Sequence, residues 1–231
     1  MARKSAATLS FPAILDRLAH IYSCDAPRAG ALMLVLWENI GYLIDDSRRE
    51  ELLREFGQRI GLVAARIARA PDALLLDIAR RGGMQPETRV ERWRRIADII
   101  LSECSGDLDA RLRELPVVRA HKLLKKFPSI GDPGADKILL FCGLDARPAL
   151  DSNGLRMLVR LGFIEAGASY AASYKSAIAF IAEASGGDRN RLVSAYLLLR
   201  EHGRMLCKRS APHCTACPLD ASCAHAPAKR L

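Results

Sequence analysis

Four cysteines lie close together near the C-terminus, in the segment CKRSAPHCTACPLDASC. They are Cys207, Cys214, Cys217 and Cys223, with the spacing C-x6-C-x2-C-x5-C. Four thiolates on a short segment suit a soft metal centre, and both a tetrahedral zinc ion and a [4Fe–4S] cluster accept four cysteine ligands. Zinc ribbons usually have two C-x2-C pairs separated by a dozen or more residues. Only one such pair is present in this segment, so the compact spacing favours the cluster over zinc.

The expected role of this metal centre is structural. The segment has little apolar content, and ligand bonds would supply the free energy that its ordering costs. Once ordered, it would present four basic side chains to a phosphate backbone: Arg204, Lys208, Arg209 and His213. The other cysteines lie in apolar helical contexts and are expected to be core residues; they are Cys24, Cys104 and Cys142.

The charge of the chain indicates a polyanionic partner. The 231 residues include 35 Lys and Arg against 26 Asp and Glu, a net charge of +9 with a pI near 9.4. Nucleic acid is the most common partner of such a protein, although a solvated arginine-rich surface would have the same composition. Half of the residues are hydrophobic, as in a folded protein of one large or two small domains.

The N-terminus MARKSAATLS has positive charges but no apolar stretch after them, and the apolar run ALMLVLW is too short to span a bilayer. We therefore expect a cytoplasmic, nucleoid-associated protein with no membrane partner. Thiols stay reduced in that compartment, where clustered cysteines bind metal more often than they form disulfides.

The apolar pattern is helical nearly throughout and predicts an all-α fold. Apolar residues recur three or four apart, and one face of residues 87–104 collects five of them: Val90, Trp93, Ile96, Ile99 and Ile100. The segment AGALMLVLWENIGYLI is apolar around most of its circumference and predicts a central buried helix. Asp72 is expected to cap one helix and Gly203 to end another.

Residues 121–143 predict two helices joined by the turn PSIGD. Gly131 is expected to adopt a positive φ in this turn, and Ile130 to enter the core. Asp132 is expected to cap the second helix, with Pro133 at its first position. Backbone N–H groups at such a turn make an anion site suited to a phosphate, and Lys125 and Lys126 lie just before it. An ordinary hairpin between packed helices fits the same pattern.

Three segments then resemble the endonuclease III superfamily of DNA glycosylases. The segment FPSIGDPGADKIL resembles its helix-hairpin-helix, and ALDSNGLRMLVRLGF resembles its valine-aspartate strip and the following arginine-bearing helix. The segment LREHGRMLCKRSAPHCTACPLDASC resembles its histidine-glycine-arginine lead-in and terminal cysteine cluster, with the same spacing at every gap. The resemblance covers roughly residues 115–225, and the N-terminal half agrees only in helical pattern and approximate length.

This resemblance implies two helical domains made from a discontinuous chain. A barrel domain would span 26–142 and carry the helix-hairpin-helix at about 118–143. Residues 1–25 and 143–231 would form the cluster domain, with the iron–sulfur loop at 207–223. The protein would be a monomer and would contain a [4Fe–4S] cluster. Its partner would be double-stranded DNA with a damaged, mismatched or abasic site, from which the protein excises the base. The DNA and the base pocket would lie at the cleft between the domains.

The resemblance places Asp151 at the position of the catalytic aspartate. A carboxylate beside the sugar stabilises the oxocarbenium character that develops when the base leaves, and it can activate a water nucleophile. The sequence LDSNG is also a good N-cap for a helix over residues 152–161, so Asp151 fits a structural role as well.

The chain departs from the family at the residue that makes strand cleavage possible. Family members with lyase activity carry a lysine two residues after the second turn glycine, and its amine forms a Schiff base with the sugar. This chain has Pro133 there, and Lys137 is one helical turn further on, about 6 Å along the axis. We therefore expect a glycosylase that does not cleave the strand, with Lys137 as a weak candidate. Ser129 also replaces a usual glycine.

The resemblance suggests DNA contacts by the hairpin and by the cysteine loop. Those of the hairpin would come from Lys125, Lys126, Ser129, Ile130, Gly131 and Gly134. Asn39 is a candidate for the wedge that fills the space of a flipped base, although it equally fits the end of a buried helix. An alternative function is a DNA-binding iron–sulfur protein that has this scaffold without catalysis.

Overall fold

The structure is a computed structural model, and it describes residues 9–23, 25–26 and 29–225. Within these ranges the chain forms twelve α-helices and two short 3₁₀ helices and no β-strand, which confirms the predicted all-α fold. A single β-bridge joins Tyr42 to Gly83. No helix in the described ranges is long and apolar enough to cross a membrane.

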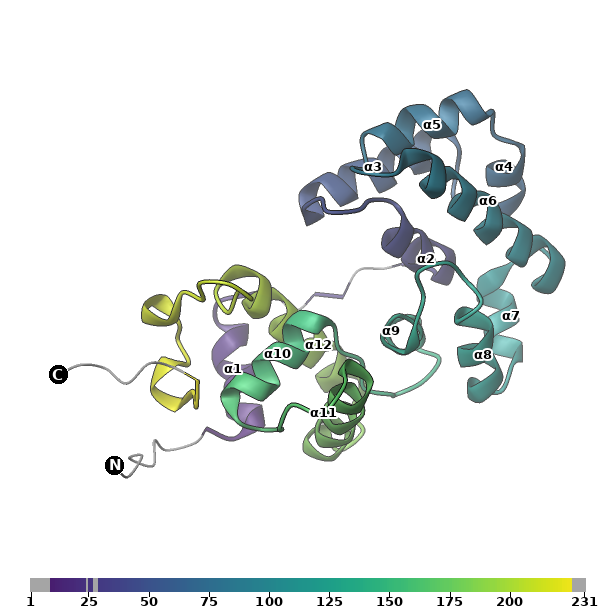
Figure 1. Cartoon of the computed structure of the whole chain (residues 1–231). Coiled ribbons are helices and arrows are strands. Elements are labelled where there is room, and N and C mark those ends of the chain that lie inside the picture. The colour runs from purple at the N-terminus through teal and green to yellow at the C-terminus, as the bar shows by residue number, and fades with distance from the viewer. Residues whose placement is uncertain (1–8, 24, 27–28, 226–231) are drawn as a thin grey trace. The chain divides into compact units, whose positions relative to one another are not determined.

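The chain divides into two compact units, each with its own helices (Figure 1). We call residues 28–145 the hairpin unit, and residues 1–27 with 146–231 the cysteine unit. The hairpin unit contains α2 (Ala31–Asn39), α3 (Asp46–Arg59), α4 (Ala64–Arg69), α5 (Asp72–Arg80), α6 (Pro86–Glu103), α7 (Leu108–Glu114), α8 (Val117–Leu124) and α9 (Asp132–Phe141). The cysteine unit contains α1 (Phe11–Ala19), α10 (Ser152–Leu161), α11 (Tyr170–Ser185), α12 (Arg189–Met205), and the 3₁₀ helices Cys214–Ala216 and Asp220–Ser222.

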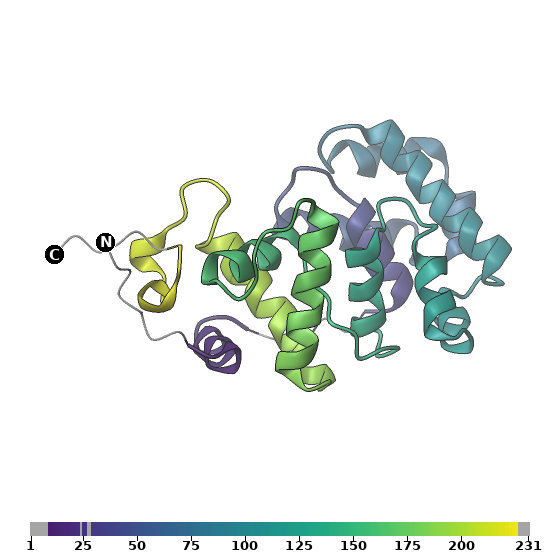
Figure 2. The same ribbon diagram turned by 60° about the horizontal axis from the view of Figure 1, so that its bottom comes forward.

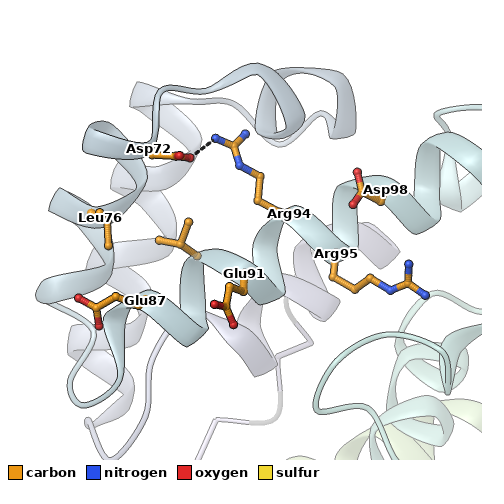
Figure 3. A pocket seen from close by; sticks show the side chains of 8 residues that line it. Asp72, Leu76, Glu87, Glu91, Arg94, Arg95 and Asp98 are labelled. Carbon is orange, nitrogen blue, oxygen red and sulfur yellow. Dashed lines mark hydrogen bonds and ion pairs between the residues drawn. The ribbon is translucent and has the colours of Figure 1, made fainter.

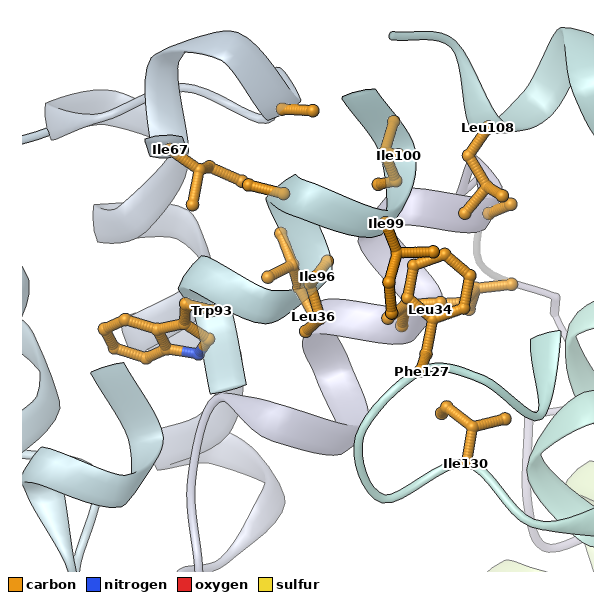
Figure 4. Packing of buried hydrophobic residues seen from close by; sticks show 14 of the residues in the cluster. Leu34, Leu36, Ile67, Trp93, Ile96, Ile99, Ile100, Leu108, Phe127 and Ile130 are labelled. Atoms are coloured by element: carbon orange, nitrogen blue, oxygen red, sulfur yellow. The ribbon is translucent and has the colours of Figure 1, made fainter. Parts of the chain in front are cut away.

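The core of the hairpin unit is built around α6 (Figure 4). All five residues predicted for its apolar face are buried, and they include Trp93 and Ile96. The Trp93 ring meets the edge of Phe56 with 4.9 Å between ring centroids, and its Nε1 donates to the Asn39 carbonyl at 3.1 Å. Because an indole N–H must find an acceptor when it is buried, this hydrogen bond fixes α6 against the end of α2.

The helix α2 ends at Asn39, although the apolar sequence predicts that it continues to Ile44. The Tyr42 amide instead donates to the Gly82 carbonyl at 2.8 Å, and the chain there runs beside Gly83. A Cβ at Gly83 would lie 2.1 Å from the Tyr42 carbonyl oxygen. This close approach requires glycine, and it replaces the last turn of the expected helix.

Asp72 does not cap α5 as predicted, because Pro71 occupies the N-cap position and Asp72 is the first helical residue. The Asp72 carboxylate instead pairs with Arg94 of α6 at 2.6 Å, across a groove between α5 and α6 (Figure 3). The same guanidinium donates to the carbonyls of Ile67 and Ala68, at 2.6 and 2.8 Å. Arg94 therefore satisfies carbonyls that the end of α4 leaves without intrahelical partners.

In the cysteine unit, α12 packs against α1, α10 and α11, and the C-terminal loop follows it (Figure 2). The prediction that Gly203 ends this helix is wrong, because α12 continues to Met205. A Cβ at Gly203 would lie 2.8 Å from the Asn153 Cβ and 2.9 Å from the Asn153 carbonyl oxygen. Glycine is present because α10 and α12 approach each other closely at this point.

We predict that Gly203→Ala destabilises the protein by about 1–3 kcal/mol, because the added methyl group must push α10 and α12 apart. The matched control is Gly57→Ala within α3, where a Cβ would lie 3.6 Å from its nearest neighbour, Leu62 Cγ. That substitution should stabilise the protein by about 0.5–1 kcal/mol through the higher helix propensity of alanine. Urea unfolding of both variants measures the two effects, and equal stability of the two would contradict the packing explanation.

Side chains on α1 hold it to the rest of the cysteine unit. The Phe11 ring meets the rings of Phe163 and Phe180 edge-on, with centroids 5.8 and 5.3 Å away. At the other end of α1, Arg17 Nη1 donates to the Pro218 carbonyl at 3.1 Å. These contacts join segments that are more than 150 residues apart in the sequence.

Candidate functional site

The four predicted metal ligands all line one pocket of the cysteine unit. They are Cys207, Cys214, Cys217 and Cys223. The remaining walls come from Arg160, Leu206, Pro212, His213, Asp220 and His225. In the described part of the chain, no three His, Cys, Asp or Glu side chains converge as the ligands of a single metal ion. Four sulfurs around one small pocket are the donor set that an iron–sulfur cluster uses, so the residues fit this group.

Nitrogen groups approach these sulfurs from several sides. Arg160 Nη1 donates to Cys207 Sγ at 3.3 Å, and the Leu219 amide donates to Cys217 Sγ at 3.4 Å. His202 Nε2 lies 3.3 Å from Cys217 Sγ. Hydrogen bonds to ligand sulfurs are among the features that tune such clusters, so this shell suits thiolate ligands.

The ionisation of the buried groups shows what a metal would change. Burial raises the pKa of the Cys217 thiol to about 11, although the Leu219 amide acts in the opposite direction. Burial also lowers the pKa of His202 to about 4, so its ring is neutral at pH 7. The other ring nitrogen, Nδ1, lies 3.1 Å from the Tyr22 hydroxyl. A coordinating metal would remove the thiol proton, because its charge outweighs the effect of burial.

Two arginines of α10 hold the start of the cysteine loop, and the sequence motifs alone do not identify them. Arg156 donates to the carbonyls of Gly203 and Cys207 at 2.8 and 2.9 Å. Arg160 donates to the carbonyls of Lys208 and Arg209 at 2.7 and 3.1 Å. Their spacing of four residues on one helical face was the available signal, since it places both guanidinium groups on the same side of α10.

The predicted basic residues of the loop lie at the surface. Lys208, Arg209 and His213 are exposed or partly exposed, whereas Arg204 pairs with Glu201 at 2.6 Å. Of the other cysteines, Cys104 is buried and Cys142 is partly buried, and Cys24 lies outside the described residues.

Asp151 is the N-cap of α10 in the cysteine unit. Its Oδ1 accepts from the amides of Asn153 and Gly154, at 3.0 and 2.8 Å. Its Oδ2 accepts from Asn153 Nδ2 at 2.9 Å and lies 3.7 Å from Arg200 Nε. The carboxylate is therefore held in one orientation by the helix end, and it remains about a quarter exposed. A fixed, partly exposed carboxylate can cap a helix and act on a ligand at the same time.

The hairpin turn belongs to the hairpin unit and differs from the prediction in its backbone. Ser129 adopts the positive φ, at 61°, while Gly131 has φ −97° and ψ −168°, which any residue can adopt. The predicted left-handed position is thus wrong by two residues. Ile130 is buried as expected, beside Phe127 (Figure 4). Ser129 stands where the resembling family has glycine, the residue that adopts a left-handed conformation most readily.

Asp132 is not the cap of α9, because Gly131 is the N-cap and no side chain caps this helix. The Asp132 carboxylate instead accepts from Lys125 Nζ at 2.6 Å, and this interaction is the main cause of its lowered pKa. The second predicted phosphate ligand, Lys126, pairs with Glu103. Both lysines therefore have a carboxylate partner in this structure, and a phosphate would have to compete for them.

Pro133 is the second residue of α9 and not the first as predicted, because the helix begins at Asp132. The weak lyase candidate, Lys137, is only 6% exposed, and its Nζ forms an ion pair with Glu38 Oε1 of α2. Neither position therefore presents a free amine.

Asn39, the wedge candidate, is 3% exposed at the end of α2. Its Nδ2 donates to the carbonyls of Val35 and Pro128, both at 2.9 Å. The second of these bonds connects α2 to the hairpin turn. The side-chain amide therefore supports the hairpin in this structure, and a role as wedge stays a prediction.

Several known proteins are similar to this chain. No protein-family model matches it. A curated endonuclease III of Sulfolobus acidocaldarius is 27% identical over 158 residues, which span 68% of this chain and 65% of that protein. A non-covalent endonuclease III–DNA complex has a TM-score of 0.73 at 18% identity and covers 92% of this chain and 93% of its own.

Two further solved structures share the fold. A thermostable thymine-DNA glycosylase has a TM-score of 0.72 at 14% identity, covering 92% of both chains. A 3-methyladenine DNA glycosylase of H. pylori, bound to 1,N6-ethenoadenine, has a TM-score of 0.62 at 15% identity and covers 81% of this chain and 91% of its own. The predicted resemblance to endonuclease III is thereby confirmed, and the chain shares the helical fold of these proteins.

Proposed function

We propose that this protein is a DNA N-glycosylase of the endonuclease III type, which hydrolyses the N-glycosidic bond of a damaged or mismatched base in duplex DNA. The fold is shared with such proteins over 92% of the chain. The observation that carries the proposal is the carboxylate of Asp151, which the amides of α10 hold in one orientation while it stays partly exposed. The net charge of +9 supports a DNA partner.

Asp151 would act on the sugar from which the base leaves. Its negative charge stabilises the positive charge that develops at the anomeric carbon as the bond to the base breaks. The base departs with the bonding electron pair and takes up a proton from solvent. A water molecule adds at that carbon and gives a proton to the carboxylate, which then releases it to solvent. Asn153 and the two amides that bind Asp151 keep the carboxylate in place during these steps.

The four cysteines of the pocket would hold a [4Fe–4S] cluster, whose bonds order the loop. Arg156 and Arg160 then fix the start of this loop to α10, and the exposed Lys208 and Arg209 are placed where a DNA backbone can bind.

One observation favours a second candidate, a DNA-binding iron–sulfur protein without catalysis. Both oxygens of Asp151 already have partners, because Oδ1 caps the helix and Oδ2 lies near Asn153 and Arg200. An aspartate whose only role is to cap α10 would make these same contacts.

Base release from defined duplexes separates the two candidates. Each duplex contains one damaged or mismatched base, and hot alkali after the incubation cleaves any abasic site that has formed. Alkali-dependent cleavage of at least one duplex is the expected result. Binding to the duplexes without cleavage of any of them would favour the non-catalytic protein.

We also predict that borohydride traps no covalent adduct between this protein and abasic DNA, because Pro133 has no amine and Lys137 is paired with Glu38. Pro133→Lys places an amine in the first turn of α9, and this variant should form an adduct that denaturing gel electrophoresis detects. An adduct with the unmodified protein would mean that another lysine acts as a lyase, and its absence after Lys137→Arg would identify Lys137.

A further inference from the structure

A second cavity lies entirely within the hairpin unit, where the end of α2 meets the start of α6 and the hairpin turn. Its volume is about 450 Å³, within the range of small-ligand sites. It is lined by Glu38, Asn39, Gly41, Tyr42, Leu43, Arg49, Met84, Gln85, Thr88, Arg89, Arg92 and Ser129. Neither Asp151 nor any of the clustered cysteines contributes to it.

Backbone strain is concentrated around this cavity. Within the described residues, five residues other than glycine have a positive φ, and three of them line the cavity: Leu43 at 58°, Gln85 at 59° and Ser129 at 61°. Each such conformation costs of the order of 1–3 kcal/mol, and strained residues tend to gather at functional sites. The gathering of three of these five strained residues around one cavity therefore indicates a functional site.

Unsatisfied polar atoms also gather there. Four buried side-chain atoms of the described residues have no hydrogen-bond partner, and two of them, Asn39 Oδ1 and Arg49 Nε, belong to residues that line the cavity. One is an acceptor and the other is a donor. Because a buried polar group without a partner costs about 1–3 kcal/mol, these two atoms reduce stability beside the cavity, as the strained backbone around it does.

The cavity combines several cations with one carboxylate. Arg89 donates to the carbonyls of Ala79 and Met84, whereas Arg92 makes no hydrogen bond or ion pair with the described residues. The carboxylate is that of Glu38, whose Oε1 is held by Lys137, while its Oε2 has no partner among the described residues. The occupant must therefore offer donors to a carboxylate and acceptors to guanidinium groups.

The rim of the cavity is apolar and exposed. Tyr42, Leu43 and Met84 are 52%, 77% and 61% exposed, although all three have large hydrophobic side chains. An aromatic side chain such as that of Tyr42 stacks on nucleobases, and apolar side chains such as those of Leu43 and Met84 can insert between bases. The hairpin residue Ser129 is part of the same lining, so the cavity adjoins the segment that is expected to bind DNA.

We propose that this cavity takes one unpaired nucleotide of the bound DNA and selects guanine. Guanine is the base whose pairing edge carries two adjacent donors, N1–H and N2–H, which match the oxygens of the Glu38 carboxylate. Its O6 and N7 accept from guanidinium groups such as that of Arg92. Adenine, cytosine and thymine lack the adjacent donor pair and would leave the carboxylate incompletely bonded. The inference rests on the proposed function, since it takes DNA as the partner.

The test uses four duplexes that contain a stable abasic analogue opposite guanine, adenine, cytosine or thymine. The base opposite the analogue has no partner and is free to leave the stack. Fluorescence anisotropy at one salt concentration should show binding about 10-fold tighter with guanine than with the other three bases. Glu38→Gln and Arg92→Gln should each reduce this preference to less than about twofold.

Glu103→Gln is the matched control, because Glu103 forms an ion pair with Lys126 in the same unit, has a similar exposure and does not line the cavity. This variant should keep the guanine preference. Thermal melting checks that Glu38→Gln is folded. If Glu38→Gln is not folded, Arg92→Gln tests the proposal independently, because it breaks no hydrogen bond or ion pair with the described residues.

Equal affinity of the unmodified protein for the four duplexes, or no binding to any of them, would overturn the guanine inference, as would an unchanged preference in both variants. Base release in the alkali assay is measured separately. Loss of the guanine preference with base release intact leaves the proposed glycosylase standing, and a guanine preference without base release overturns the glycosylase alone.

Discussion

Asp151→Asn is expected to lower the rate of base release by about 10²–10⁴-fold. Asparagine has nearly the same shape, and its side-chain oxygen can still accept from the amides of Asn153 and Gly154, so α10 remains capped. What the substitution removes is the negative charge that would stabilise the sugar cation and the group that would accept a proton from water. Single-turnover assays with alkali treatment measure the rate, and fluorescence anisotropy measures DNA affinity, which should change by less than about threefold.

The chain provides a matched control at Asp188, the N-cap of α12. Its Oδ1 accepts from the amides of Asn190 and Arg191, two and three residues on, as Asp151 does at α10. Asp188→Asn should leave base release unchanged. If Asp151→Asn released bases at the rate of this control, Asp151 would be only a helix cap.

Cys217→Ser is expected to remove most of the iron from the purified protein. Cys217 is the third of the four proposed ligands, and a serine hydroxyl is a poor ligand for an iron–sulfur cluster. The unmodified protein should be brown, absorb broadly in the violet-blue range and carry about four iron atoms per chain. The variant should lose this absorbance, and proteases should cleave its loop over residues 207–223 much faster, because the ligand bonds that order the loop are gone.

Cys104→Ser is the control, because Cys104 is buried in the core of the hairpin unit and is not one of the four clustered cysteines. It should lose some stability but keep its iron content and loop protection. Unmodified protein that is colourless and contains zinc would contradict the cluster and support the alternative that the cysteine spacing left open.

The sequence predicts the helices well, because their apolar faces are regular. The five-residue face of α6 and the buried position of Ile130 follow directly from spacing three and four residues apart. The joint lining of one pocket by four cysteines likewise follows from their proximity in the chain. In both cases the determining information is local.

The errors arise where a distant segment decides the local structure. Gly203 is predicted to end a helix, but glycine is needed at this position because Asn153 of another helix approaches it closely. Asp72 and Asp132 are both predicted to cap a helix. The carboxylate of Asp72 instead binds Arg94, and that of Asp132 binds Lys125, so neither carboxylate caps its helix. Helix and capping propensities describe the local preference of a residue, and contacts with other parts of the folded chain override that preference.

The cavity proposed to take a nucleotide is similarly absent from the sequence pattern. Glu38, Arg92 and Ser129 are separated by up to 91 residues, and only Ser129 belongs to a recognisable motif, the hairpin turn. The positive φ of Ser129 cannot be read from a serine, because this residue rarely adopts it. Only the folded chain brings these groups into one lining.

The discontinuity of the cysteine unit has a consequence for synthesis on the ribosome. The apolar face of α1 is completed by Phe163 and Phe180, and Arg17 binds the carbonyl of Pro218, so this first helix lacks its partners until nearly the whole chain has emerged. Translation of about 200 residues at 5–20 residues per second leaves it unprotected for roughly 10–40 s. The hairpin unit is contiguous and can fold during that interval, whereas the proposed cluster could form only after Cys223 appears. A nascent chain stalled before residue 223 should therefore hold one finished unit and one exposed helix that chaperones can bind.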